Sequence, residues 1–266
     1  MRPQISIITI TFNSGKTLER TIQSVISQNY EQLEYLIIDG GSTDNTMDIV
    51  KKYHDHISFS ISEPDKGISD AFNKGIHYAT GEIIGIINSD DTLLPGALDA
   101  IANAYDPKID VYRGHTIYEN IKTKFRFSSK PSLEFPVSNY MKISVCHQGT
   151  FVTKTAYTRV GGYKTDIRYI MDMDLLFRLY NSGCTFKYVP YDIAVFYSGG
   201  ATSDSFYKKV GERYRVIREN GGSVFTAIKV NLHCIIKDIA KIVFDTLFGE
   251  NFKYRLRGRK NLPLTE

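Results

Sequence analysis

The sequence predicts an α/β protein built on a doubly wound, mostly parallel β-sheet with a helical, basic C-terminal extension. Two observations predict the sheet: short β-branched runs alternate with segments of helical periodicity, and each run ends in small or polar residues. The third observation is charge: residues 205–266 carry 13 Lys and Arg against 6 Asp and Glu, while the whole chain has a net charge of only +4. We therefore expect a sheet domain over 1–204 and an extension over 205–266.

Four successive strand–helix units make up the first part of the domain. In each unit an Ile-, Leu- or Val-rich run is followed by a turn and then by apolar residues at helical spacing. Connections of this kind are right-handed, so four in succession give a parallel sheet with helices on its faces. The expected strands span 5–11, 33–39, 57–61 and 83–87, and the expected helices lie at about 18–26, 47–51, 69–78 and 95–105.

The second part breaks this alternation. Extended, aromatic-rich segments at 110–118 and 124–127 predict strands of a mixed sheet or a hairpin, and a helix is expected from about 169 to 180. That helix carries Asp172 and Asp174, which are two positions apart and so lie on different faces. The simplest interpretation of Asp174 is an i,i+4 ion pair with Arg178, and that of Asp172 is a charge complementing the helix dipole. At most one of the two carboxylates is expected to point into a site.

Polar residues follow each strand of the first part, and handedness places them on one edge of the sheet. A nucleotide-binding crevice is expected along that edge. Adjacent carboxylates after a buried strand suit a hard divalent cation bridging phosphate oxygens, although such residues also turn chains and cap helices. The strand-end residues are Thr11 and Asn13, Asp39 and Gly40, Asp65 and Lys66, and Asn88, Ser89, Asp90 and Asp91.

Several nucleotide-binding classes lack their motifs here. Neither 13–15 nor 40–42 extends to G-x-G-x-x-G before a helix, which argues against a dinucleotide-dependent dehydrogenase, and no P-loop pattern is present. A nucleotidyltransferase is disfavoured because no basic phosphate-binding signature opens the chain. The three cysteines, Cys146, Cys184 and Cys234, are widely spaced and odd in number, so we expect neither a disulfide framework nor a cysteine metal site, and a reducing cytosol. We also expect neither a signal peptide nor a membrane-spanning helix.

The extension is expected to contain helices over about 204–219 and 225–248, separated by Gly221-Gly222. In the second helix an apolar arc lies beside a stripe of basic residues. One hypothesis docks the helix on the domain by this arc; the other rests it on an anionic membrane surface, helped by basic residues at 253–260. No nucleic-acid-binding motif accompanies the charge, so no nucleic acid is expected. The arc comprises Phe225, Ile228, Leu232, Ile235, Ile239, Ile242 and Val243.

Five blocks, in order and extending over roughly residues 4–200, resemble those of the inverting glycosyltransferases of family 2. The resemblance implies the GT-A fold and transfer of a sugar from a nucleotide sugar, with UDP favoured, in bacterial capsule, O-antigen or exopolysaccharide synthesis. The blocks are I-S-I-I-T-I-T-F-N-S-G, I-I-D-G-G-S-T-D-N-T, D-K-G-I-S-D-A-F-N-K-G-I, I-I-N-S-D-D and M-D-M-D-L-L-F-R-L.

The resemblance also implies roles for the matching residues. Thr11 and Asn13 would touch the nucleotide base, and Asp39 would accept a hydrogen bond from a uracil N–H. Asp65 and Lys66 would border the nucleoside. In the D-x-D block, Asn88 and Ser89 would contact the nucleotide. Asp90, with its neighbour Asp91, would hold Mn²⁺ or Mg²⁺. Asp172 would be the catalytic base.

Three departures from the family pattern bear on these roles. Asn88 replaces the first Asp of the metal motif, Phe72 replaces a frequent Arg, and Met171 replaces the Glu before Asp172. The base assignment survives these changes, whereas the complete coordination sphere of a metal does not follow.

The expected partners are a nucleotide-sugar donor and a saccharide acceptor linked to a polyprenyl diphosphate at the inner face of the cell membrane, and a homo-oligomer is an open expectation. His147 and Gln148 precede the Asp172 helix and are candidates for lining the acceptor side, although a lone His is more often structural. From another class, a non-catalytic sugar-nucleotide or partner-binding module on the same fold is the alternative. Binding of UDP without turnover would distinguish that module from an enzyme.

Overall fold

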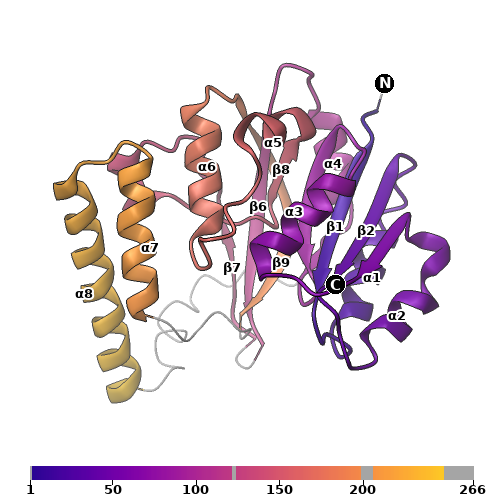
Figure 1. The fold of residues 1–266 in the computed structure, drawn as a ribbon, viewed down its shortest axis with the longest axis horizontal. Helices are drawn as coiled ribbons and strands as arrows, with labels where there is room; N and C mark the ends of the chain where they lie inside the picture. Colours follow the sequence, from indigo (N-terminus) through magenta and orange to yellow (C-terminus); the bar gives the residue numbers. More distant parts are fainter. Residues whose placement is uncertain (1, 122–123, 199–205, 249–266) are drawn as a thin grey trace.

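The protein is built around a mixed, nine-stranded β-sheet in the computed structural model, which describes residues 2–121, 124–198 and 206–248 (Figure 1). The strand order is β3-β2-β1-β4-β8-β6-β9-β5, and β7 pairs with β6 beside this path. The strands are β1 (Ile5–Thr11), β2 (Leu33–Asp39), β3 (Phe59–Ser62), β4 (Ile83–Asn88), β5 (Thr92–Leu93), β6 (Val111–Asn120), β7 (Arg126–Ser129), β8 (Thr150–Thr153) and β9 (Phe186–Ser198).

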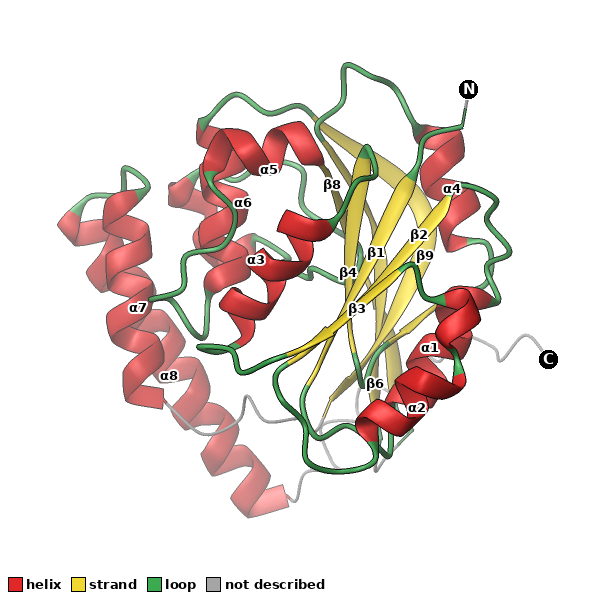
Figure 2. Cartoon of the chain, turned by 45° about the vertical axis from the view of Figure 1, so that its right-hand side comes forward, coloured by secondary structure: helices red, strands yellow, loops and turns green. Residues whose placement is uncertain are grey.

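Helices cover both faces of the sheet, as the strand–helix alternation predicts (Figure 2). On one face lie α1, α2 and α4, and on the other lie α3, α5 and α6, with α7 and α8 beyond α6. The helices are α1 (Leu18–Ile26), α2 (Thr46–Lys52), α3 (Ile68–Tyr78), α4 (Ala97–Ala104), α5 (Lys154–Val160), α6 (Met171–Asn181), α7 (Phe206–Glu219) and α8 (Val224–Phe248), with short 3₁₀ helices η1 (His54–His56) and η2 (Val137–Lys142).

The chain changes direction across the sheet between β1 and β4. The first strand pairs in parallel with β2 on one side and with β4 on the other, while chain order runs outward through β2 and β3 before returning to β4. In open α/β sheets, ligands bind beyond the carboxyl ends of the strands at such a reversal. The ends of β1, β2 and β4 therefore mark the expected position of the site.

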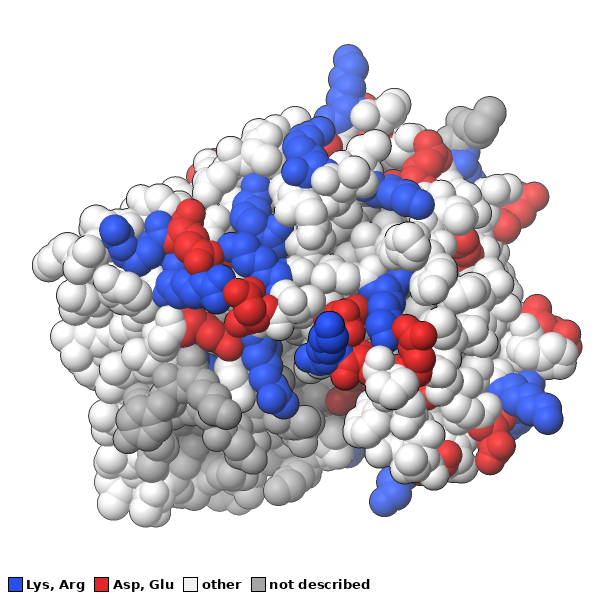
Figure 3. All heavy atoms as spheres, in the orientation of Figure 1, with Lys and Arg blue, Asp and Glu red and all other residues white. Residues whose placement is uncertain are grey.

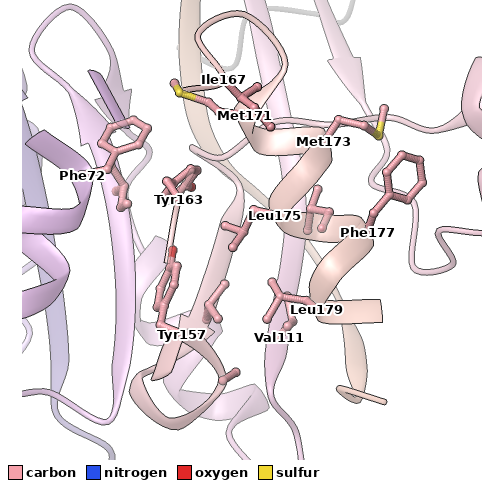
Figure 4. Close-up of a cluster of buried hydrophobic side chains, with 14 of the residues drawn as sticks. Phe72, Val111, Tyr157, Tyr163, Ile167, Met171, Met173, Leu175, Phe177 and Leu179 are labelled. Atoms are coloured by element: carbon pink, nitrogen blue, oxygen red, sulfur yellow. The ribbon is translucent and has the colours of Figure 1, made fainter. Parts of the chain in front are cut away.

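Two apolar layers hold the helices on the sheet. Ile, Leu and Val side chains alternate between the faces of β1, β2 and β4, so each parallel strand is buried on both sides. The larger layer includes α6, whose Leu175, Phe177 and Leu179 pack among aromatic residues such as Phe72 and Tyr163 (Figure 4). At full burial each such side chain contributes about 1.5–3 kcal/mol. This packing fixes the N-terminal end of α6, where Asp172 lies.

The mostly parallel sheet is confirmed, and its additions lie in the second part. Strands β6 and β9 pair in parallel, whereas β8 runs antiparallel to both β4 and β6, and β5 antiparallel to β9. The sequence analysis predicts neither the strands β5, β8 and β9 nor the helix α5. Two of these strands are at most four residues long, and β9 contains Pro190 and pairs with β6 through register shifts, so periodicity alone is a weak guide there.

The helix α8 contradicts the hypothesis that it docks by its apolar arc. Its buried contacts come from a narrow face that includes Ala227, Val230 and Asn231. Along the opposite side runs an apolar stripe whose side chains are 50–74% exposed, and Figure 3 shows mostly uncharged surface where α8 lies. We define the apolar stripe as Phe225, Ile228, Leu232, Ile236, Ile239, Val243 and Leu247.

Within the described residues, none of the helices combines the length and apolar character required to span a bilayer. The basic cluster at 253–260 lies outside the described residues.

Candidate active site

The loops after β1, β2 and β4 meet at the carboxyl edge of the sheet. The Ser14 and Ser89 hydroxyls lie 2.7 Å apart, joining the loop after β1 to that after β4. Asn13, at φ +48°, accepts a hydrogen bond from the Thr43 amide at 2.9 Å and so holds the loop after β2. The Thr11 hydroxyl is buried and has no hydrogen-bond partner among the described residues. The structure therefore places these predicted strand-end residues side by side.

Asp39, at the end of β2, is engaged by the loop that follows it. Its carboxylate is fully buried and accepts from the Gly41 and Ser42 amides at 3.1 and 2.9 Å and from the Ser42 and Ser62 hydroxyls. Oδ2 accepts three of these hydrogen bonds and Oδ1 only one, so Oδ1 keeps an acceptor position. Asp39 therefore fixes the loop after β2, and its contact with a uracil N–H stays a prediction.

An aromatic side chain that the sequence analysis did not single out also lies at this edge of the sheet. Phe12, the residue after β1, is 61% exposed although it is large and apolar. A β-carbon added to Gly40 would lie 3.4 Å from the Phe12 ring and 2.5 Å from the Asp65 carboxylate, so backbone, ring and carboxylate converge there. Asp65 also accepts from the Gly67 amide at 2.7 Å, and Lys66 is exposed beside it. The exposed face of an aromatic ring is suited to stacking against a planar base.

The turn after β4 separates its two carboxylates into different environments. Asp91 is fully buried and accepts from the Gln148 side-chain amide at 2.6 Å, the Asn88 amide at 3.2 Å and the Tyr197 backbone at 3.1 Å. Asp90 is partly exposed, and its backbone carbonyl accepts from Arg20 at 2.7 Å. The predicted pair is thus one buried, hydrogen-bonded carboxylate and one that faces the crevice.

Burial shapes the charge of this turn. It raises the pKa of Asp90, an effect that Arg20 and His147 partly offset. Burial, with the neighbouring charge of Asp90, raises the pKa of Asp91 to about 6, against the hydrogen bond from Gln148. Two carboxylates that resist ionising together form a favourable environment for a cation.

A divalent ion fits the residues of this turn. The Asn88 side-chain oxygen is buried without a partner among the described residues, and it belongs to the same turn as the Asp90 carboxylate. Oxygen ligands of this kind suit Mg²⁺ or Mn²⁺, which commonly use one or two carboxylates together with substrate phosphates. The described part of the chain holds no cluster of three or more His, Cys, Asp or Glu that could bind a metal.

Asp172 lies at the first turn of α6 and pairs with His147. The His147 Nδ1 is 2.9 Å from Asp172 Oδ2, while His147 Nε2 and Asp172 Oδ1 are both buried without partners among the described residues. Burial alone would lower the pKa of His147, but the charge and hydrogen bond of Asp172, with smaller effects of Asp91 and Asp90, raise it overall. His147 therefore contacts the predicted catalytic carboxylate, and its neighbour Gln148 contacts Asp91 on the β4 turn.

Gln148 does not line an acceptor site. Its side chain is buried, its amide donates to Asp91, and its carbonyl oxygen lies 2.7 Å from the Cys146 thiol. The side chains of His147 and Gln148 point in different directions, so that His147 contacts Asp172 while Gln148 holds the β4 turn. Phe72, at the position of the frequent Arg, is buried with its ring 5.2 Å from that of His147, in an edge-on arrangement.

Asp174 forms the predicted ion pair with Arg178, at 2.7 Å, and faces away from Asp172. It is also fully buried and lies 3.1 Å from the Lys164 ammonium. The predicted pair is therefore confirmed, and because it is buried, Asp174 also anchors α6 to neighbouring segments.

Comparison with known proteins agrees with this architecture. The family model "Glycosyl transferase family 2" matches residues 6–161. The chondroitin synthase of Escherichia coli is 28% identical over 193 residues, which cover 70% of this chain but only 28% of that protein. A PGL/p-HBAD biosynthesis glycosyltransferase of Mycobacterium bovis is 27% identical over 215 residues, covering 78% of this chain and 82% of that protein.

Solved structures share the fold at low sequence identity. TarS 1-349 of S. aureus in complex with UDP-GlcNAc has a TM-score of 0.63 at 16% identity, covering 86% of this chain and 70% of that one. The mannosyltransferase PcManGT from Pyrobaculum calidifontis, in complex with GDP-Man and Mn²⁺, has a TM-score of 0.59 at 18% identity, covering 88% and 69%.

The mixed sheet and its strand-end crevice, with this structural likeness, define a GT-A fold. The chain belongs to glycosyl transferase family 2 and is a glycosyltransferase.

Proposed function

We propose that the protein is an inverting glycosyltransferase that moves a sugar from a UDP-sugar to a saccharide acceptor. The observation that carries the proposal is that two consecutive residues join the β4 turn to the α6 carboxylate: His147 Nδ1 lies 2.9 Å from Asp172 Oδ2, and the Gln148 amide donates to Asp91 at 2.6 Å. A donor diphosphate at the turn would leave its sugar facing the His147–Asp172 pair. The complexes of the two structural relatives with nucleotide sugars support this placement.

The proposed reaction is a single displacement. The acceptor hydroxyl oxygen forms a bond to the anomeric carbon while the bond from that carbon to the diphosphate breaks, and the hydroxyl proton passes to a base on the opposite face. A divalent cation would supply electrostatic stabilisation of the departing diphosphate. On the protein side, Asp90 and Asn88 would hold the cation, and Phe12 and the loop fixed by Asp39 would bind the nucleoside.

The acceptor is proposed to be carried by a lipid, such as a polyprenyl diphosphate, at the inner face of the cell membrane. The exposed apolar stripe on α8 supports this, because a membrane interface accommodates apolar side chains that the described residues leave uncovered.

The proposal is tested by titrating wild-type protein with UDP and with GDP, with and without Mn²⁺, followed by a screen of UDP-sugars for UDP release. We expect metal-assisted binding of UDP. Asp90→Ala should lose turnover and metal-dependent binding while its thermal unfolding stays close to that of wild type, and excess EDTA should act in the same way. Full activity of Asp90→Ala, or in EDTA, would refute the metal role; binding without any turnover would favour a binding module.

A further inference from the structure

A pocket lies outside the strand-end crevice, where β9 bulges away from β6. From Arg113 to Thr116 β6 advances by three residues, while β9 advances by six residues between their partners, Tyr188 and Ala194. Such a bulge leaves residues unpaired and turns their side chains in new directions. The pocket has a volume of about 540 Å³, within the range of about 300–1,000 Å³ found for small-molecule sites. Its lining residues are Leu94, Pro95, His115, Pro190, Tyr191 and Asp192.

The carboxylate of Asp192 is held in position at this pocket by two neighbouring strands. His115 Nδ1, on β6, lies 3.2 Å from Asp192 Oδ1, and the hydroxyl of Ser128, on β7, donates to the same oxygen at 3.1 Å. The other oxygen, Oδ2, has no hydrogen-bond partner among the described residues, and the side chain is 47% exposed. An ionised carboxylate only accepts hydrogen bonds. The pocket therefore presents a fixed acceptor, which requires a donor such as a hydroxyl on the ligand.

Charges of both signs lie close to the pocket. The His115 ring is oriented from its other side by Tyr188, whose hydroxyl lies 2.5 Å from His115 Nε2. The ammonium of Lys130 lies 4.9 Å from the centre of the Tyr188 ring, while the Asp192 carboxylate lines the pocket itself. Asp192 would repel an anionic ligand and Lys130 a cationic one. This arrangement favours a neutral ligand.

Tyr191, in the bulge, adds an aromatic ring that is both exposed and held in place. Its side chain is 41% exposed, and its hydroxyl donates to the Pro95 carbonyl at 2.8 Å. Gly96, at φ +76°, makes room for this contact, because a β-carbon there would lie 2.7 Å from the Tyr191 hydroxyl oxygen. A tyrosine fixed at its hydroxyl end offers apolar contact area at a low cost in conformational entropy. The ring is therefore a rigid apolar surface beside the Asp192 acceptor.

We propose that this pocket binds a neutral saccharide at a distance from the reacting atoms. A pyranose ring has C–H groups on one face, which pack on an aromatic ring such as Tyr191, and hydroxyl donors at its edge, which Asp192 accepts. Tyr197, whose amide donates to Asp91 in the crevice, lies five residues beyond Asp192 on β9, or about 16 Å. The pocket would thus hold units of the acceptor remote from its reacting end. The inference rests on the proposed saccharide acceptor and not on the identity of the donor.

The test is a titration of the full chain with three neutral tetrasaccharides, cellotetraose, chitotetraose and maltotetraose, with and without UDP and Mn²⁺. We expect at least one of them to shift the nuclear magnetic resonance signals of the His115 ring in a saturable way. Tyr191→Ala and Asp192→Asn should each lower its affinity about tenfold. The matched controls are Tyr78→Ala, at a tyrosine that is 39% exposed, and Asp55→Asn, in an exposed pair with His54 at 3.0 Å, and both should bind as wild type does.

Three outcomes would overturn the proposal: no shift of the His115 signals by any of the three sugars, wild-type affinity in both pocket variants, or equal losses in the pocket variants and their controls. A tetrasaccharide of galacturonic acid should bind more weakly than the neutral sugars, because Asp192 repels its carboxylates. All four variants should bind UDP as wild type does. Failure of the proposed function would be seen separately, as wild-type protein that binds no UDP, and the titration with sugar alone would still test the pocket.

Discussion

Asp174 is a charged side chain with no solvent exposure, and its carboxylate contacts Arg178 at 2.7 Å and Lys164 at 3.1 Å. Arg178 in turn donates to the Val160 and Gly162 carbonyls at 2.7 Å each. The network therefore ties α6 to the end of α5 and to the loop between them, and through α6 it positions Asp172.

Asp174→Asn should destabilise the protein by about 3–5 kcal/mol, because removing one partner of a buried ion pair leaves the other charge uncompensated. Urea unfolding measures this. The control is Asp166→Asn, which breaks the ion pair of Asp166 with Arg215, between two half-exposed side chains, and should shift the unfolding midpoint little. Equal effects of the two substitutions would contradict the role given to Asp174. Folded Asp174→Asn should still bind UDP.

The sequence predicted which residues lie at the strand ends. It did not predict which of their side chains form hydrogen bonds within the protein. Thr11, Asn13 and Ser89 do meet at one edge, because parallel strands bring their carboxyl ends together. Asp91 is satisfied by Gln148 and Tyr197, from segments 57 and 106 residues further along the chain, and periodicity carries no information about such partners. Its burial could therefore not be predicted.

At the scale of elements, the strand-end crevice depends on braces from outside the sheet. Arg20 on α1 donates to the Asp90 carbonyl and stacks 4.0 Å from the centre of the Tyr197 ring, and Thr21 donates to the Asp91 carbonyl at 2.7 Å. The α1 helix thus holds the β4 turn from one side while Gln148 holds it from the other. The spacing of Leu18, Ile22 and Val25 predicted the α1 helix but not its hydrogen bonds to the β4 turn.

The opposite edge of the sheet has its own brace in Glu34, at the start of β2. Its carboxylate accepts from the hydroxyls of Ser6 and Thr80 and from the amides of Thr80 and Gly81, so it joins β1 and β2 to the turn before β4. Burial raises the pKa of Glu34, but these hydrogen bonds together outweigh burial and lower it.

This depressed pKa predicts a pH dependence of stability. A carboxylate with a lower pKa in the folded than in the unfolded state stabilises the fold above the unfolded value of 4.5, and the contribution is lost as pH falls through the folded pKa. Glu34→Gln should therefore cost about 1 kcal/mol at pH 7, allowing for partial solvent screening, and much less at pH 3. The measurement is urea unfolding at both pH values. A cost that is the same at both would show that shape, and not charge, matters at this position.

Continuous apolar runs predicted β1, β2 and β4, because these strands are buried on both faces. A period of 3.6 residues predicted the helices between the first strands, because each helix presents one apolar side. Periodicity predicted fewer of the elements in the second half of the domain. Strand β8 is only four residues long and is placed by pairing with β4 on one side and β6 on the other, which is a property of the assembled sheet and not of its own sequence.

For the whole molecule, the unexplained feature is α8. It is attached through α7 and η2 by a narrow face, and the apolar stripe points away from the domain. Lys229, His233 and Lys237 are exposed on the same helix, and more basic residues follow at 253–260, outside the described residues. An anionic bilayer attracts a surface helix in two ways, by burying its apolar side chains and by electrostatic attraction of its basic residues, and α8 presents both kinds of side chain.

The protein should therefore bind vesicles containing anionic lipid at low salt, and binding should weaken as salt rises, because each basic residue near the surface contributes about 1 kcal/mol that salt screens. Replacing Leu232 and Ile236 of the apolar stripe by Ser should reduce binding at all salt concentrations, because it removes apolar area without changing charge. Ile121→Ser, at an exposed apolar position at the end of β6, is the control and should bind as wild type does. If instead the wild type ignores anionic vesicles and sediments as a dimer that the stripe variant dissociates, the stripe is an interface between two copies, and the membrane role proposed for it is wrong.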